Sequence, residues 1–98
     1  MKTPPPINEQ NAIQIASDFL KDISFADRVV IQHAAAAFFD GDVMYAEMIR
    51  DFPEIKIPRL SDTWHVTFPL KEPLPEVDVD RRYVIVDAVT GAAKMGLA

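Results

Sequence analysis

The sequence predicts an α+β fold, in which two or three N-terminal helices pack on one face of a three- or four-stranded, mainly antiparallel sheet. Two runs in the last third predict the sheet. In the first, Trp64, Val66 and Phe68 alternate with polar residues, and a period of two is typical of a half-buried strand. The second run, residues 83–89, is rich in β-branched residues. The N-terminal third instead carries apolar residues at helical spacing, which predicts the covering layer.

The first helix is expected over residues 9–22, after a proline-rich N-terminal segment at residues 1–7. Asn8 is suited to cap its N-terminus, and Ile7 can pack on Ala12 as a hydrophobic staple. The helix presents a single apolar stripe made of Ala12, Ile15, Ala16, Phe19, Leu20 and Ile23.

A second helix is expected over residues 25–39, where Ser24 and Asp27 form a capping-box-like start. The β-branched residues 29–31 fit either a helix or a strand, and the four alanines that follow favour a helix. Apolar residues surround this segment on nearly all sides. We therefore expect a second covering surface, either within the domain or in a homodimer formed through residues 29–39.

The sequence Asp40-Gly41-Asp42 interrupts the helical pattern, with Gly41 suited to end one helix and Asp42 to cap the next. A third helix is expected over residues 43–51. It ends before Pro53, and residues 52–60 are expected to be extended.

Prolines and one glycine shape the expected sheet. Pro69, Pro73 and Pro75 argue against a central strand between residues 69 and 76 and predict a stiff, protruding loop. Asp87 and Gly91 predict a tight turn, because the carboxylate can accept hydrogen bonds from turn amides and glycine can adopt positive φ. Residues 92–97 are then expected to return as a short last strand.

Length and composition limit the domain count and the compartment. Ninety-eight residues, 49% hydrophobic and 26% charged, are expected to form a single domain over residues 1–98. The chain has no cysteine, which fits a reducing compartment. The start does not resemble a signal peptide, and no apolar run approaches membrane-spanning length, so we expect a cytoplasmic protein with no membrane partner.

The charge distribution indicates the kind of partner. The net charge of −5 disfavours nucleic acid, and two segments hold most of the surplus: residues 40–54 sum to −4 and residues 69–80 to −3. Acidic surfaces of this kind steer basic partners. The predicted partner-binding residues are Asp40, Asp42, Glu72, Glu76, Asp78 and Asp80.

No spacing in the sequence supports catalysis or metal binding. His33 and His65 are the two histidines, without His-x-x-x-His spacing, and we expect His33 to be packed and His65 to be solvated on a strand. The acids around Gly41 do not match a calcium loop, and no phosphate loop or nucleophile motif is present. We expect a protein that is not an enzyme and has no cofactor.

The order of three stretches resembles that of PepSY domains. They are the helix Ala12-Ile13-x-Ile15-Ala16-x-x-Phe19-Leu20, the strand Trp64-x-Val66-x-Phe68, and Val84-Ile85-Val86-Asp87-Ala88-x-Thr90-Gly91-Ala92. The strand and turn are also similar to those of small bacterial immunity proteins of the nuclear-transport-factor-like fold. Both resemblances imply a non-catalytic binding or inhibitory module. The apolar segment 25–39 is not part of the short PepSY unit.

Two function classes follow. The first is a protein-binding, inhibitory module, most plausibly an immunity protein that neutralises a bacterial toxin through its acidic surface. The alternative is a small-ligand-binding or regulatory sensor domain. Its apolar pocket is expected between the second helix and the sheet, lined by Phe38, Phe39, Trp64 and Phe68.

Overall fold

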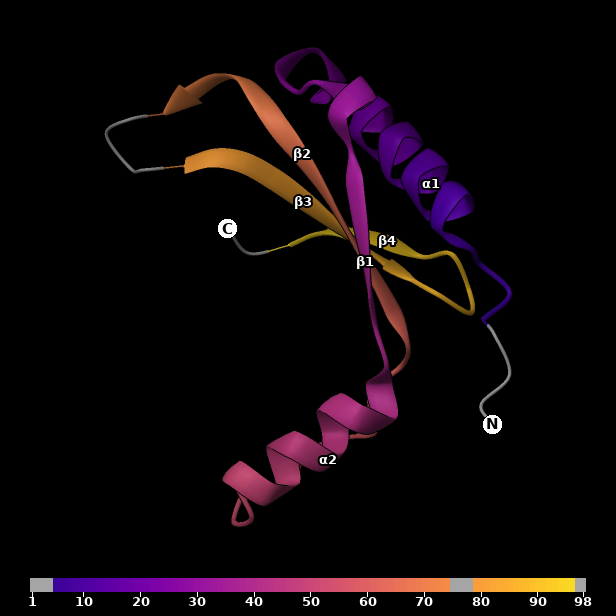
Figure 1. The fold of residues 1–98 in the computed structure, drawn as a ribbon, viewed down its shortest axis with the longest axis vertical. Helices are drawn as coiled ribbons and strands as arrows, with labels where there is room; N and C mark the ends of the chain where they lie inside the picture. Colours follow the sequence, from indigo (N-terminus) through magenta and orange to yellow (C-terminus); the bar gives the residue numbers. More distant parts are fainter. Residues whose placement is uncertain (1–4, 75–78, 97–98) are drawn as a thin grey trace.

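A computed structural model gives the arrangement of the chain and describes residues 5–74 and 79–96. Figure 1 shows its helices and strands. The helices are α1 (Glu9–Asp22) and α2 (Gly41–Asp51), and short 3-10 turns lie at Ala26–Arg28 and Ile31–His33. The strands are β1 (Ala35–Phe39), β2 (Thr63–Leu74), β3 (Val79–Asp87) and β4 (Ala93–Met95). The predicted α+β class is therefore confirmed.

The four strands form one antiparallel sheet in the order β1-β2-β3-β4. The register places Phe38, Trp64, Val86 and Ala93 in one row across the sheet. The neighbouring row contains Ala37, His65, Ile85 and Lys94. Because successive side chains on a strand point to opposite faces, these two rows lie on different faces of the sheet.

The core lies between α1 and one of these faces. Its buried members are Ala12, Ala16 and Leu20 from α1, Val66 and Phe68 from β2, Val84 and Val86 from β3, and Val29. The predicted stripe of α1 is thus the face it buries, except for Ile23, which follows the helix and is exposed. Asn8 caps the helix by accepting a hydrogen bond from Asn11 N–H at 2.8 Å. The indole Nε1 of Trp64 donates to the Ile7 carbonyl at 2.8 Å, which ties β2 to the segment before α1.

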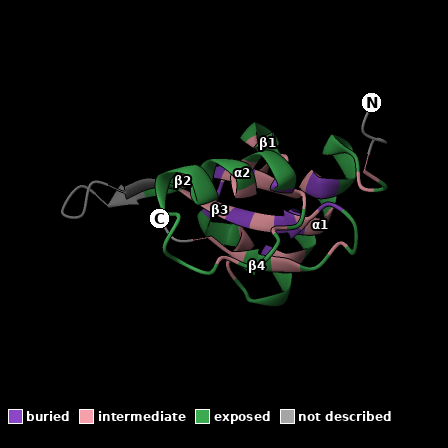
Figure 2. Cartoon of the chain, turned by 90° about the horizontal axis from the view of Figure 1, so that it is seen from below, coloured by how far each residue is buried: buried purple, intermediate pink, exposed green. Residues whose placement is uncertain are grey.

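Fewer helices pack on the sheet than predicted. Within the described residues the core takes helical side chains from α1, whereas the one buried residue of α2 is Gly41. Figure 2 shows the same contrast, with buried residues on the sheet and α1 and mainly exposed or intermediate ones on α2. The expectation that two or three helices cover one face of the sheet is not confirmed.

The predicted helix over residues 25–39 is wrong. Ser24 has a φ of 60°, which is outside the helical region, and it is followed by two 3-10 turns and then by β1. Val29 forms an isolated antiparallel bridge with Leu70, and His33 is exposed rather than packed. Pairing of the alanines with β2 outweighs their modest helix propensity, because propensity is a weak preference that tertiary contacts override.

The predicted loop over residues 69–76 is also wrong in its first half, because β2 continues to Leu74. Pro69 pairs with Arg81, and the register with β3 shifts between Pro69 and Leu74. Since β1 pairs with β2 only as far as Thr67, the prolines lie where a missing N–H costs few ladder bonds. The Pro69 carbonyl still accepts a hydrogen bond from Val30 N–H at 2.9 Å. Pro75 lies outside the described residues.

Helix α2 projects from one end of the sheet, and the C-terminal end of α1 lies toward the opposite end (Figure 1). The radius of gyration is 14.9 Å, compared with about 13 Å for a compact domain of this length. The described part of the chain contains no helix with the length and apolar character needed to cross a bilayer.

Candidate functional site

The six acids predicted to bind a partner do not gather on one surface. Asp40 is the N-cap of α2, and its Oδ1 accepts hydrogen bonds from Asp42 N–H and Val43 N–H at 2.9 and 3.3 Å. Glu72 lies nine residues along β2 from Thr63, the pairing partner of Phe39, which corresponds to roughly 30 Å. Asp40 and Asp42 therefore lie at the other end of the sheet from Glu72.

Of the other three acids, Asp80 is on β3, and Glu76 and Asp78 lie outside the described residues. Glu72 borders a concavity of about 490 Å³ whose charged lining comprises Arg28, Lys71, Arg82, Asp27 and Glu72 itself. Because basic residues outnumber acidic ones there, Glu72 does not stand in an acidic surface.

The acids at the start of α2 belong to a projecting segment, residues 40–59, which we call the arm. The arm combines charge with exposed apolar side chains, a feature that the sequence interpretation missed. Its largest exposed apolar residues are Val43, Met48, Ile49, Phe52 and Ile55. Five acids and one basic residue between positions 40 and 54 indicated a charged surface in the sequence. The apolar residues among them, however, were assigned to a packed helix.

The arm has its own internal contacts. The guanidinium of Arg59 pairs with the Asp42 carboxylate at 3.3 Å and lies 5.0 Å from the centre of the Tyr45 ring. Tyr45 and Ile49 border a hollow that is closed on its other side by the return segment, residues 53–58. These contacts hold helix and return segment together without covering the outer apolar side chains.

Within the described part of the chain, no helix packs on the sheet face opposite to α1, and this face displays a row of rings. The Phe39 and His65 ring centroids are 4.1 Å apart, and the His65 and Tyr83 rings are stacked at 6.0 Å. Partial burial lowers the pKa of His65, because the imidazolium would lose hydration there. His65 was expected to be a solvated strand residue, but it is half-buried between two aromatic rings.

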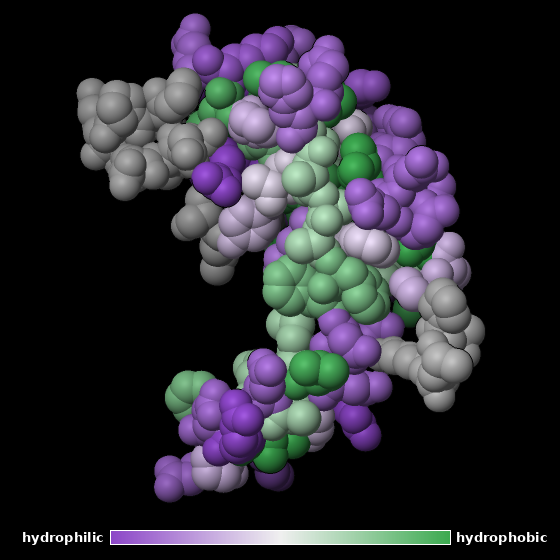
Figure 3. Space-filling model, viewed as in Figure 1, coloured by the Kyte–Doolittle hydropathy of each residue, from purple (hydrophilic) through white to green (hydrophobic). Residues whose placement is uncertain are grey.

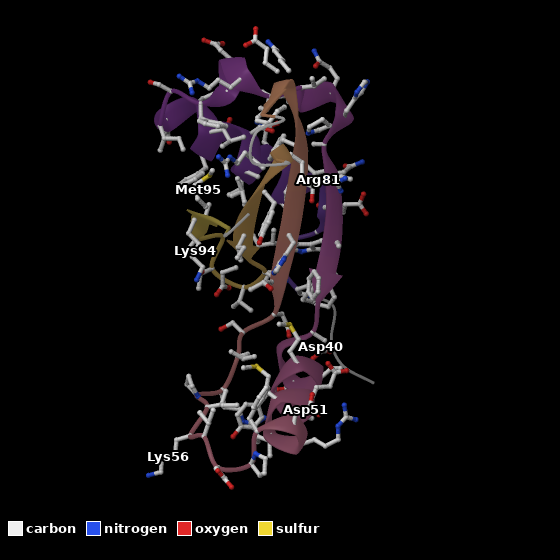
Figure 4. All side chains as sticks on the ribbon, turned by 90° about the vertical axis from the view of Figure 1, so that its left-hand side faces the viewer. Asp40, Asp51, Lys56, Arg81, Lys94 and Met95 are labelled. Carbon is white, nitrogen blue, oxygen red and sulfur yellow. The ribbon has the colours of Figure 1, made fainter. Side chains whose placement is uncertain are left out.

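A concavity of about 500 Å³ lies on this open face, between the sheet and the base of the arm. Ile85 and Leu60 provide apolar surface, Arg59 and Lys94 carry positive charge, and Asp87 carries negative charge. Arg59 is also paired with the Asp42 carboxylate. Figure 4 looks toward this hollowed side and shows Lys94 on β4 above the arm. The site therefore combines an apolar floor with charged groups of both signs.

The four aromatic residues predicted to line one pocket do not do so. Phe38 and Trp64 contact each other with ring centroids 5.1 Å apart, and Phe68 is fully buried in the core. Phe39 follows Phe38 on β1 and stacks on the opposite face. Alternation along β1 separates the two phenylalanines, which the helical assignment had placed on one side.

Asp87 fulfils its predicted structural role. Its Oδ1 accepts hydrogen bonds from Val89 N–H and Thr90 N–H at 2.8 and 2.9 Å, and Gly91 has a φ of 80°. The bonds from Thr90 and Val89 lower the pKa of the Asp87 carboxyl. Within residues 5–74 and 79–96, no group of three histidine, aspartate or glutamate side chains is arranged to hold a metal ion.

Comparisons with models of protein families, with curated proteins and with solved structures find no match to this chain. The resemblance to PepSY domains and small immunity proteins therefore stays a prediction.

Proposed function

We propose that this chain is a non-catalytic, cytoplasmic protein-binding module that inhibits its partner, as an immunity protein inhibits a toxin. The observation that carries the proposal is the arm, which projects from the sheet and exposes apolar and acidic side chains together (Figure 1). Large apolar side chains are seldom left on a projecting element unless a partner covers them.

The chemistry of the arm defines the partner's surface. Apolar anchors such as Phe52 and Met48 supply the area whose burial drives association, and Glu47 and Asp51 surround them with negative charge. A partner with apolar hollows bordered by lysine or arginine fits this pattern, and the acids would raise its association rate. The proposal thus keeps Asp40 and Asp42 in the binding surface and leaves Glu72 outside it.

The proposal is tested by expressing this chain together with the products of its neighbouring genes in a bacterial host. A neighbour that stops growth alone and is tolerated in the presence of this chain supports an inhibitory role. Binding of the purified pair is then measured at low and high salt, where the electrostatic part of the attraction is screened. The proposal fails if no neighbouring product is toxic or bound.

Variants matched in exposure or in change of charge assign the binding to the arm. Phe52 is 55% exposed and Val89, at the β3–β4 turn, is 56% exposed, so Val89→Ala is the matched control for Phe52→Ala. Glu47→Lys is paired with Asp22→Lys, which changes the charge equally at the end of α1. We expect weakening by about tenfold or more for the arm variants alone, as for truncated anchor residues at interfaces. Equal effects of arm and control variants would reject the arm as the site.

The concavity on the open face favours a second candidate function, the binding of a small organic anion. Its volume of about 500 Å³ is within the range of small-molecule sites, and Lys94 can attract a carboxylate on the side of the concavity away from Asp42 and its partner Arg59. A panel of aromatic and aliphatic carboxylates in a thermal-shift assay tests it. A shift lost in Lys94→Met but kept in Lys21→Met would support this function, and no shift at millimolar concentration would remove it.

A further inference from the structure

Strand β1 forms an edge of the sheet, since it pairs with β2 on one side and has no strand on the other among residues 5–74 and 79–96. It is composed of three alanines and two phenylalanines, and four of its five residues are exposed. In Figure 3 a band of hydrophobic residues runs along β1 through the middle of the visible face. An edge strand displays unpaired N–H and C=O groups, so it can pair with a further strand.

This edge lacks the features that normally prevent strand pairing. Edge strands are usually protected by charged residues, prolines, bulges or a covering element. Residues 35–39 contain no charge and no proline, and their pairing with β2 is regular from Ala35 to Phe39. The ribbon of α2 lies below the sheet and does not reach in front of β1 (Figure 4). Helix α1 contacts β1 on the face that carries Ala36, yet four of the five residues of β1 stay exposed. The edge is therefore open to another chain.

We propose that two copies of this chain associate by antiparallel pairing of their β1 strands about a two-fold axis at Ala37. This register sets Ala37 against Ala37 of the second copy. It sets Phe39 against Ala35 on the open face, and Phe38 against Ala36 on the other face. Each large ring thus lies over a methyl group, where it has room, and the pairing is identical when the copies are exchanged.

Charge favours the same arrangement. Two chains of net charge −5 repel each other, but residues 29–39 contain no acid and the paired strands are neutral. The register brings Asp40 of one copy beside residue 34 of the other, next to His33. Acidic residues of the two copies are therefore not set against each other at the ends of the paired strands.

The small area of the proposed interface limits the strength of the association. Five-residue strands and their rings bury less than the roughly 800 Å² per partner that stable interfaces need. We therefore expect dissociation in the micromolar range. Sedimentation equilibrium of the wild-type chain between about 10 and 500 µM should show the mass rising from 11.0 kDa toward twice that value. A monomer over this whole range would overturn the proposal.

A lysine variant tests the contact. Ala37→Lys places two like charges at the two-fold axis, whereas Val89→Lys makes the same charge change at an exposed turn. We expect Ala37→Lys to be monomeric with an unchanged circular dichroism spectrum, and Val89→Lys to associate like the wild type. Equal association of both variants would contradict the register.

Cysteine scanning tests the register without relying on a destabilising change. The chain has no cysteine, so a disulfide formed by a single introduced thiol can link it to another copy but not to a second cysteine of the same chain. Residues that face each other in an antiparallel pair have Cα atoms about 4.5–5.5 Å apart, which a disulfide can span. Ala37→Cys should therefore cross-link on oxidation, whereas Ala35→Cys, whose two copies lie roughly 13 Å apart along the strands, should not. Equal cross-linking of both variants would reject the proposed axis.

Discussion

The backbone N–H of Gly41 donates a hydrogen bond to the Asp62 carboxylate at 2.9 Å, across 21 positions of sequence. This bond joins the first residue of α2 to the residue before β2, so both ends of the arm are held at one point. Gly41 is buried there against Leu60 and Ser61, and a Cβ atom built on it would fall on the Leu60 carbonyl. Glycine is needed at this position because the two backbones approach closely, and Gly41 has no positive φ.

Gly41→Ala should destabilise the fold, because the added methyl group must push two backbone segments apart. Forcing extra atoms into a packed contact costs about 1–3 kcal/mol. Urea unfolding followed by circular dichroism measures the loss. Ala46→Ser, an exposed substitution in the same helix, should stay within about 0.5 kcal/mol of the wild type. Equal stability of Gly41→Ala and the wild type would contradict the close approach.

Asp87→Ala should destabilise the β3–β4 turn in a pH-dependent way. The pKa of the Asp87 carboxyl is lowered by the bonds from Thr90 and Val89, so its stabilising effect is present above the unfolded value of about 4 and is lost as the pH falls through the folded pKa. We expect a loss of about 1 kcal/mol at pH 7, as for a lost carboxylate cap. The difference from the wild type should shrink between pH 4 and pH 2. A difference that is constant over this range would indicate that ionisation of Asp87 plays no part.

Local sequence signals correctly predicted the elements whose own residues favour the conformation that they adopt. The stripe and cap of α1, the alternation of Trp64, Val66 and Phe68, and the turn at Asp87 are all readable within a few residues. The alanines of β1 carry no such signal, because their conformation is decided by pairing with β2, about thirty residues away. Pro69 was misread for the same reason, since the regular pairing of β2 with β1 stops at Thr67 because β1 begins at Ala35.

Predicting the candidate sites required knowledge of these long-range strand pairings. The row formed by Phe39, His65 and Tyr83 exists because the register sets three strands side by side, so it could not be predicted while residues 25–39 were assigned to a helix. Asp42 was expected to cap a helix, but the N-cap of α2 is Asp40, and Asp42 lies in the first turn. Their separation from Glu72 follows from the length of β2, which the prolines had concealed.

His65 should make the fold less stable in mild acid. Because burial lowers the pKa of His65, the unfolded chain protonates this ring at a higher pH than the folded chain does. The free energy of unfolding should therefore fall as the pH drops below about 6.5, and should level off below the folded pKa. His65→Phe keeps an aromatic ring between Phe39 and Tyr83 and removes the titration. Urea unfolding of both proteins from pH 5 to pH 8 should give a flatter profile for the variant, and identical slopes would contradict the prediction.

Phe68 and Phe38 should respond very differently to truncation, although both are phenylalanines of neighbouring strands. Phe68 is fully buried in the core, and replacing such a residue with alanine costs about 3–5 kcal/mol. Phe38 is 39% exposed and contacts the Trp64 ring, so Phe38→Ala should cost about 1 kcal/mol.

A charged variant, Phe38→Asp, distinguishes two roles of this side chain. Phe38 either packs in the core of its own chain or contacts a second copy along β1. We expect a folded monomer, since the paired strands would lose their ring contact while α1 still covers the core. An unfolded Phe38→Asp variant of a monomeric wild type would show that Phe38 belongs to the core.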